Sequence, residues 1–277
     1  MADELTLTAP AKLNLCLRVG PVGADGFHPL ASLMVALDGL CDTVTVRRAA
    51  RREVRCPGID GPGNLAWAAL DALAAEAGEP LPPLAVEIGK RIPSEAGLGG
   101  GSSDAAATLV AARDLLGLPL DAAALERAAA RVGSDVPFLV RGGAQWATGR
   151  GERLRPVDVP AGLWAVVVPP VTGLSTPRVY RAFDRIARPV APPADPPAAL
   201  WTAGWAVNDL WPAALACAPR LGAVARSLRA LRPVTVLLCG SGGAMAALFD
   251  REEAAREAAG RWGPDAAVCA PAPLRAV

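Results

Sequence analysis

The amino-acid sequence predicts an α+β protein made of two halves. Strand patterns and helix patterns follow one another in mixed order in both halves, and not in the regular alternation of one doubly wound sheet. The chain has 277 residues, of which 52% are hydrophobic, so one large core or two moderate cores can form. The pattern resets around residues 155–162, which predicts a first domain over 1–158 and a second over 159–277.

Three strands are expected before the middle of the chain. Residues 5–19 alternate in polarity for much of their length, and Pro10 predicts a bend or bulge inside this strand. A second strand is expected at 42–48, after a loop and an apolar run. A third is expected at 84–93, where the alternation returns.

Three helices are expected in the same half. The first follows Asn64, which is placed to be its N-cap, and ends at Gly78. The second begins directly after a glycine-rich stretch and ends near Gly117. The third has Asp121 as its N-cap and Gly133 just beyond its end.

The rest of the chain is expected to contain a hairpin and then a second unit of strands and helices. The hairpin falls within residues 142–157. The later elements are, in order, a strand at 163–170, a helix at 176–187, a proline-rich spacer at 188–197, a helix at 219–232, strands at 235–241 and 244–250, a helix at 251–262 and a final strand.

Composition narrows the class of partner. The formal net charge is +1, so the basic footprint of a nucleic-acid binder is missing and a small-molecule ligand is expected. The N-terminal residues lack the features of a signal peptide, and no apolar run approaches the ~18 residues that cross a bilayer. We therefore expect a cytoplasmic protein outside the membrane. The six cysteines contain no CxxC pair that would predict zinc.

A glycine-rich loop joins the third strand to the second helix. Four glycines fall within five positions: Gly97, Gly99, Gly100 and Gly101. Without Cβ atoms, such a loop lets N–H groups converge on a ligand, and the helix N-terminus adds about half a positive charge. These features predict a phosphate site. The competing interpretation is a flexible loop with Ser102 or Ser103 as an N-cap, and the spacing matches neither a Walker A loop nor a dinucleotide fingerprint.

Motifs spread over the chain resemble the GHMP kinase superfamily. They are PAKLNL at 10–15, PSEAGLGGGSSDAA at 93–106 and LLCGSGGAMAALF at 237–249. The resemblance implies a two-domain GHMP kinase fold, with an N-terminal half like ribosomal protein S5 domain 2 and a ferredoxin-like C-terminal half. With DGFHPL at 25–30 and GSDVPF at 133–138, the set resembles kinases that phosphorylate the 2-hydroxyl of a cytidine diphosphate alcohol in non-mevalonate isoprenoid synthesis.

The resemblance implies ATP and Mg²⁺ as cofactors. The residues expected at the nucleotide are Gly97, Leu98, Gly99, Gly100, Gly101, Ser102 and Ser103, with Asn64 and Lys90 as further contacts. The ligands of the metal are left open, with Ser102, Ser103 and Asp104 as candidates.

Lys12 and Asp135 are the expected catalytic residues. From the residues alone, the favoured interpretation of Asp135 is a cap of the next element. Its resemblance to a GADVP-type motif reverses that preference and implies that Asp135 accepts the proton of the acceptor hydroxyl and binds the acceptor. Lys12 is its natural partner and can stabilise the moving phosphoryl group, although a lysine at a strand edge can also simply extend to solvent. Asn14 lies two residues on, hence on the same strand face, and can contact substrate.

The acceptor site is expected to involve three ring side chains and a second glycine loop. The resemblance assigns His28 to the cytosine, although its imidazole can equally satisfy nearby backbone. Phe27 and Tyr180 offer flat surfaces for the base, with core packing as the alternative for Tyr180. The loop containing Gly240, Ser241 and Gly242 either closes over the acceptor diphosphate or forms a tight strand connection.

Two other functions stay open at this point. One is another small-molecule kinase of the same superfamily, of the homoserine or mevalonate kinase type. The other is a nucleotide-binding sensor without catalysis, against which the retention of both Lys12 and Asp135 argues. Whether the protein forms a homodimer is also left open.

Overall fold

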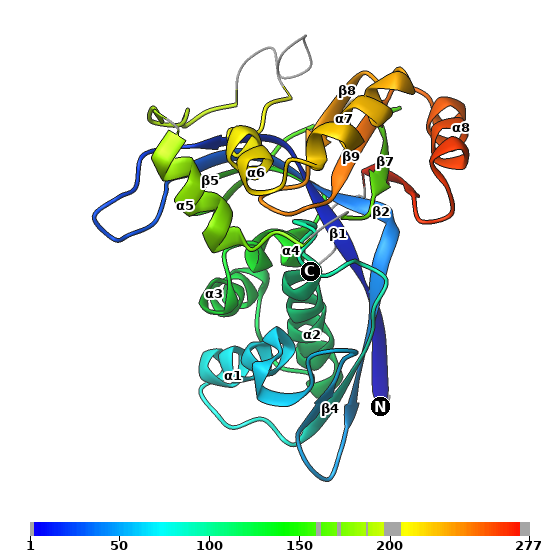
Figure 1. Cartoon of the computed structure of the whole chain (residues 1–277). Coiled ribbons are helices and arrows are strands. Elements are labelled where there is room, and N and C mark those ends of the chain that lie inside the picture. Colours follow the sequence, from blue (N-terminus) through cyan, green and yellow to red (C-terminus); the bar gives the residue numbers. More distant parts are fainter. Residues whose placement is uncertain (1–2, 159–161, 171–172, 187, 197–205, 272–277) are drawn as a thin grey trace.

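The computed structural model contains a ten-stranded sheet and two groups of helices (Figure 1). It describes residues 3–158, 162–170, 173–186, 188–196 and 206–271. The strands are β1 (Glu4–Val19), β2 (Leu30–Arg48), β3 (Glu53–Arg55), β4 (Leu84–Gly89), β5 (Ala144–Gly149), β6 (Arg153–Pro156), β7 (Trp164–Val168), β8 (Thr235–Leu238), β9 (Met245–Phe249) and β10 (Ala267–Pro271). The α-helices are α1 (Leu65–Ala77), α2 (Gly100–Leu116), α3 (Ala122–Val132), α4 (Val136–Arg141), α5 (Thr176–Ile186), α6 (Trp211–Cys217), α7 (Leu221–Ala230) and α8 (Glu252–Trp262).

The long antiparallel pair β1–β2 is the centre of the fold. It is hydrogen-bonded from Glu4↔Arg47 to Val19↔Leu30, and its register shifts between Pro10 and Lys12, which confirms the predicted irregularity. β2 begins earlier than the sequence predicted. Residues 31–37 are all buried, so they show no alternation from which a strand could be recognised.

Helices α1 to α4 pack beside β1, β2 and β4 (Figure 1). The predicted caps are confirmed, because the Asn64 side chain accepts from Ala66 N and the Asp121 side chain accepts from Ala124 N. The alternative in which a serine caps α2 is wrong. α2 begins at Gly100 with Gly99 as its N-cap, so Ser102 and Ser103 lie inside its first turn.

α7 and α8 lie on one face of the C-terminal strands β7, β8 and β9 (Figure 1). α5 and α6 pack against each other and belong to the same hydrophobic cluster as that face. The predicted hairpin is present as β5–β6. Among the described residues, four short elements were not predicted: β3, α4, α6 and the 3-10 helix at Gly61–Gly63. Residues 187 and 197, the ends of the predicted helix and spacer, lie outside the described residues, as do residues 159–161 at the predicted domain boundary.

The two halves share a buried core and a continuous sheet. β10 pairs with β7 and also with β2, through Ala270↔Asp38 and Pro271↔Leu37. Side chains of β1 and β2 such as Leu13 and Val35 belong to the same hydrophobic cluster as Leu248 of β9. The division at 158/159 stays a prediction. Among the described helices, none has the length and apolarity needed to span a bilayer.

Candidate active site

Lys12 and Asp135 meet beside the glycine-rich loop, as predicted. Lys12 Nζ lies 3.5 Å from Asp135 Oδ2, and the two side chains are 7% and 34% exposed. Asp135 stands at the start of α4, directly after the break that ends α3. The ammonium is thus buried and the carboxylate is reachable from solvent, which suits a carboxylate that receives a proton from an incoming hydroxyl.

Asn14 holds the Lys12 ammonium from the other side. Lys12 Nζ donates to Asn14 Oδ1 at 2.6 Å, and Asn14 Nδ2 donates to Ser32 Oγ at 2.8 Å. Ser32 Oγ in turn donates to Cys16 O at 2.7 Å. This chain of hydrogen bonds runs between β1 and β2 and fixes the amide of Asn14 with its oxygen toward Lys12. The prediction that Lys12 and Asn14 share a strand face is confirmed.

The glycine-rich loop lies directly on Lys12. Lys12 N donates to Leu98 O at 2.8 Å. Gly99 has φ +71°, and a Cβ built on it would lie 2.8 Å from Lys12 Cγ, so this position requires glycine for both conformation and space. A Cβ on Gly97, whose φ is +79°, would lie 1.8 Å from Cys239 O.

The first turn of α2 offers N–H groups that no preceding helical carbonyl can accept. Ser103 N already donates to Gly99 O at 2.8 Å, so the free groups lie earlier, around Gly100 and Gly101. Gly101 is exposed and Ser102 is half-buried. This end of the helix can therefore receive an anionic group such as a phosphate, next to Lys12.

Lys90 is held by two carboxylates next to Gly100 at the start of α2, and its contact with a nucleotide stays a prediction. Its Nζ donates to Asp104 Oδ2 at 2.7 Å and to Asp42 Oδ2. Asp42 is fully buried, and its other oxygen accepts from the backbone N–H of Ile92 at 2.8 Å. Lys90 thus joins β2 to the first turn of α2 behind the glycine-rich loop.

Within the cluster of Lys90, Asp42 and Asp104, the pKa values of Asp104 and Lys90 are shifted. Burial raises the pKa of Asp104 to about 7, while Lys90 lowers it and Asp42 raises it. The pKa of Lys90 is raised, because the two carboxylates outweigh its burial.

These contacts bear on the candidate metal ligands. Asp104 is buried and turned toward Lys90, and Ser103 Oγ is buried without a hydrogen-bond partner. The described residues contain no group of three His, Cys, Asp or Glu side chains arranged to hold a metal. Asp104 Oδ2 is paired with Lys90, whereas Asp104 Oδ1 is buried without a hydrogen-bond partner, so the candidates Ser102, Ser103 and Asp104 stay a prediction for the metal.

The second glycine loop joins β8 to β9 and rests on the first one. Gly243 N donates to Glu95 O at 3.3 Å, and Ala244 N donates to Ala96 O at 3.2 Å. A Cβ on Gly242 would lie 2.1 Å from Gly97 N. Of the two readings for residues 240–243, the tight strand connection is observed, and contact with the acceptor remains a prediction.

His28 and Tyr180, both predicted for the acceptor site, lie side by side. Their ring centroids are 5.3 Å apart, and the ring of Phe183 meets His28 edge-on. His28 Nδ1 is 2.7 Å from Gly20 O, and Nε2 is 3.2 Å from Asp184 Oδ1. The backbone contact offered as an alternative for His28 is thus present. Burial, and then the negative charge of Asp135, raises the pKa of Tyr180 to about 12.

Phe27 is exposed on the turn made by Asp25 and Gly26. Its N–H donates to Asp25 Oδ1 at 3.0 Å, and Gly26 has φ +77°. The guanidinium of Arg150 lies 3.8 Å from the Phe27 ring centroid and donates to Asp25 Oδ2 at 2.6 Å. The β5–β6 turn therefore contacts the loop between β1 and β2, with one face of the Phe27 ring covered.

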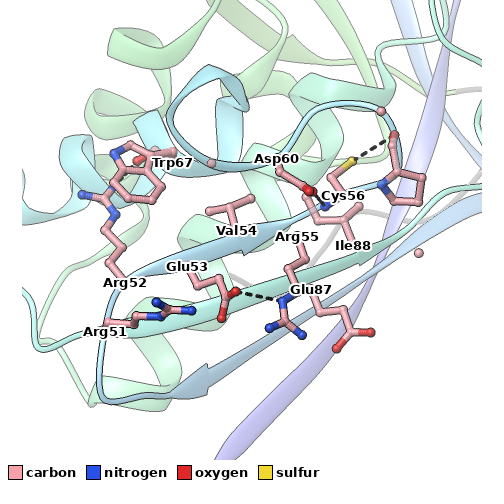
Figure 2. Close-up of a pocket in the computed structure, with 14 residues that line it drawn as sticks. Arg51, Arg52, Glu53, Val54, Arg55, Cys56, Asp60, Trp67, Glu87 and Ile88 are labelled. Atoms are coloured by element: carbon pink, nitrogen blue, oxygen red, sulfur yellow. Dashed lines mark hydrogen bonds and ion pairs between the residues drawn. The ribbon is translucent and has the colours of Figure 1, made fainter.

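A separate hollow of about 790 Å³ lies at the β3–β4 edge. Figure 2 shows Arg55 and Glu53 paired along β3, Arg52 beside Trp67, and Asp60 in the loop above Cys56. None of the residues predicted for the site lines this hollow. The hollow and the Lys12–Asp135 pair are therefore distinct places in the molecule.

Three polar residues near the site were not predicted from the sequence. Ser32, Asp42 and Asn208 are all buried and polar. Asp42 is the first residue of a predicted strand, Ser32 lies in an apolar run, and Asn208 belongs to none of the motifs. A polar side chain within an apolar run is the signal that could have drawn attention to Ser32.

The fold and the glycine-rich loop together define a class of small-molecule kinase. The sequence profile of the GHMP kinases N terminal domain matches residues 64–143, which include α1 to α4 and the loop. A crystal structure of homoserine kinase from Cytophaga hutchinsonii shares the fold, with a TM-score of 0.73 at 20% identity over 98% of this chain and 96% of that one. The class is therefore the GHMP kinases.

Two more similar proteins narrow the family. The 4-diphosphocytidyl-2-C-methyl-D-erythritol kinase of Anaeromyxobacter dehalogenans (strain 2CP-C) is 42% identical over 266 residues, covering 92% of this chain and 84% of that protein. A crystal structure of 4-(cytidine 5'-diphospho)-2C-methyl-D-erythritol kinase superposes with a TM-score of 0.80 at 34% identity, over 97% of this chain and all of that one. The chain belongs to the 4-diphosphocytidyl-2-C-methyl-D-erythritol kinase family.

Proposed function

We propose that this protein transfers the terminal phosphoryl group of ATP to the 2-hydroxyl of 4-diphosphocytidyl-2-C-methyl-D-erythritol. The observation that carries the proposal is the Lys12–Asp135 pair, 3.5 Å apart and in contact with a glycine-rich loop at a helix N-terminus. Such a site brings together a cation, a proton acceptor and a phosphate cradle, which are the parts that phosphoryl transfer to an alcohol requires.

In the proposed reaction, the acceptor hydroxyl attacks the terminal phosphorus and its proton goes to the Asp135 carboxylate. The new bond joins the acceptor oxygen to phosphorus, and the bond from phosphorus to the bridging oxygen of ADP breaks. Lys12 lies beside Asp135 and stabilises the negative charge on the phosphoryl oxygens. The N–H groups at the start of α2 hold the phosphates in place.

The cytosine ring of the acceptor is proposed to bind near His28, Tyr180 and Phe27. His28 and Tyr180 are in ring contact, and Phe27 stands exposed on the adjacent turn. In this proposal a cytosine displaces Asp184 from His28 Nε2, since the exposed Asp184 can move while Nδ1 keeps its bond to Gly20 O. Gly240 lies next to Lys12 Nζ, and Gly240, Ser241 and Gly242 are assigned to the diphosphate.

ATP is the nucleotide expected of this class, and Mg²⁺ is part of the proposal as the partner of its phosphates. Asp104 Oδ2 is paired with Lys90 and Asp104 Oδ1 is unpaired, and the candidates for the metal stay Ser102, Ser103 and Asp104. The proposed setting is the cytoplasm, with a small-molecule acceptor and no nucleic-acid substrate. A homodimer stays a prediction that nothing in this site tests.

An ADP-release assay with three acceptors tests the proposal. The purified protein is given ATP and Mg²⁺ with 4-diphosphocytidyl-2-C-methyl-D-erythritol, homoserine or mevalonate. We expect ADP release that depends on the cytidine diphosphate alcohol and is near background with the other two. Release that depends on homoserine or mevalonate would reassign the substrate, and nucleotide binding without release for any acceptor would support a sensor.

A further inference from the structure

A short segment before α6 is hydrogen-bonded to β1 close to the active site. Leu17 N donates to Val207 O at 2.7 Å, and Asp209 N donates to Leu17 O at 3.0 Å. Leu17 and Asn208 thereby form a parallel β-bridge. Three positions before Leu17 on the same strand is Asn14, so this segment is fixed relative to the strand that carries Lys12 and Asn14.

Asn208 uses the hydrogen-bonding capacity of its side chain toward the second glycine loop and α6. It is 8% exposed, and its Nδ2 donates to Leu238 O at 3.0 Å and to Gly240 O at 2.7 Å. Its Oδ1 accepts from Leu210 N at 2.9 Å. Two carbonyls and one N–H define the orientation of the amide, because only its NH₂ group can face the carbonyls.

One of the two carbonyls that Asn208 holds belongs to Gly240, whose Cα lies next to Lys12 and Asn14. Gly240 has φ +54°, and a Cβ built on it would lie 3.1 Å from Lys12 Nζ and 3.3 Å from Asn14 Oδ1. The backbone of Gly240 therefore closes the side of the site on which the Lys12 ammonium lies. A shift of this backbone would change the space around both Lys12 and Asn14.

The residue after Asn208 anchors the loop between β1 and β2, which is called the acceptor loop because it carries Phe27 and His28. Asp209 Oδ2 accepts from Val19 N at 3.0 Å, and Asp209 Oδ1 accepts from Arg18 at 3.2 Å. Val19 is the last residue of β1, directly before the loop that carries Phe27 and His28. Two adjacent side chains thus hold the glycine loop on one side of the site and the acceptor loop on the other.

We propose that Asn208 is a positioning residue for phosphoryl transfer, which places the Gly240 backbone against Lys12 and Asn14. The inference rests on the proposed function. Asn208 acts through Gly240 and touches no reacting atom. Small displacements of catalytic groups have large kinetic effects. Loss of the two hydrogen bonds that Asn208 Nδ2 donates should therefore impair turnover of the acceptor. The N-terminus of α2 should still bind ATP.

The test replaces the donors of Asn208 in two ways. Asn208→Asp places a carboxylate against two carbonyl oxygens, and Asn208→Ser removes both donors without adding charge. For each variant we expect kcat/KM for the acceptor to fall about 10- to 100-fold, as for a misplaced catalytic group, with the Kd for ATP changed no more than about threefold. Hydrogen exchange of the amides at 239–244 should become faster.

A matched control separates positioning from general loss of stability. Leu228→Ala creates a cavity in α7, far from the catalytic pair along the chain and buried in the C-terminal cluster. It should lower the Tm while leaving the kinetic constants of the folded protein unchanged. Gly240→Ala, which keeps Asn208 intact, should reproduce the kinetic defect of the Asn208 variants, and the double variant should show less than the sum of the two effects.

The inference is overturned if the wild type phosphorylates the acceptor and both Asn208 variants have the wild-type kcat/KM for the acceptor. It is also overturned if Asn208→Ser lowers ATP affinity and acceptor turnover in parallel. If the Asn208 variants fail to fold, Gly240→Ala decides: unchanged acceptor kinetics in that variant overturn the inference. Inactivity of the wild type with this acceptor is a different result, which contradicts the proposed function itself.

Discussion

At the scale of single residues, the proposed phosphoryl transfer depends on Lys12 and Asp135. The sequence placed them together only through the resemblance of their motifs, because nothing in local pattern joins β1 to the start of α4. The structure brings Lys12 Nζ to 3.5 Å from Asp135 Oδ2. The environment of Lys90 was not predictable in the same way, since its two carboxylate partners come from a distant strand and from a helix whose first turn had to be positioned first.

The first prediction concerns that pair. Lys12→Ala and Asp135→Asn should each lower kcat by about 100-fold or more, the size expected for an electrostatic or acid–base group. Steady-state kinetics with the cytidine diphosphate alcohol measures this. Circular dichroism and ATP binding serve as controls for folding, and near-normal turnover by either folded variant would refute the assignment.

The second prediction concerns Asp104 and pH. Its folded pKa is about 7, whereas an unfolded aspartate titrates near 4, so between these values the folded protein holds a proton that the unfolded chain has lost. The free energy of unfolding should therefore fall as pH rises from about 4 to about 7 through this group. Asp104→Asn keeps a neutral side chain at every pH and should remove that contribution.

Urea denaturation of the wild type and Asp104→Asn across this pH range is the measurement. The difference in unfolding free energy between the two proteins should change steadily from about pH 4 to about pH 7 and then level off. A difference that stays constant over the whole range would show that Asp104 titrates as an ordinary carboxyl group.

At the scale of elements, the sequence predicted the features that depend on neighbouring residues, such as helix caps and strand irregularities. The caps at Asn64 and Asp121 and the irregularity at Pro10 follow from side chains acting on their own backbone. The early part of β2 and the short α4 were missed, because their side chains are buried without a period that a sequence reveals.

The third prediction compares two glycines of the same loop. Gly97→Ala should destabilise the protein by more than the ~1–3 kcal/mol of a strained backbone alone, because φ is +79° and the new Cβ would lie 1.8 Å from Cys239 O. Gly101→Ala is the matched control: it lies inside α2, with Leu65 Cδ1 at 3.6 Å from the new Cβ, and should be neutral or stabilising.

Chemical denaturation of both variants checks this pair. Equal unfolding free energies for Gly97→Ala and Gly101→Ala would contradict the close contact between the first glycine loop and the β8–β9 connection.

At the scale of the whole molecule, the mixed order of elements predicted the α+β class, but not how the halves join. The joining depends on β10, which pairs with both β2 and β7, and on a core to which Leu13, Val35 and Leu248 all belong. Such long-range contacts leave no trace in local periodicity, so two separate cores were as compatible with the sequence as one shared core.

The fourth prediction follows from the shared core. Unfolding of one half removes the buried partners of the other, so the full chain should unfold in one cooperative transition. Far-UV circular dichroism and tryptophan fluorescence should give the same midpoint in denaturant. Two separated midpoints would show that the halves are independent units.

The central claim is that the Lys12–Asp135 pair moves a phosphoryl group from ATP to the alcohol of a cytidine diphosphate acceptor. Phosphorus NMR of the reaction tests it most directly, because a new phosphomonoester on the acceptor has its own resonance. We expect that resonance with the wild type, and a rate of appearance reduced about 100-fold or more with folded, ATP-binding Lys12→Ala. No phosphomonoester with the wild type, or the same rate with the variant, would contradict the account.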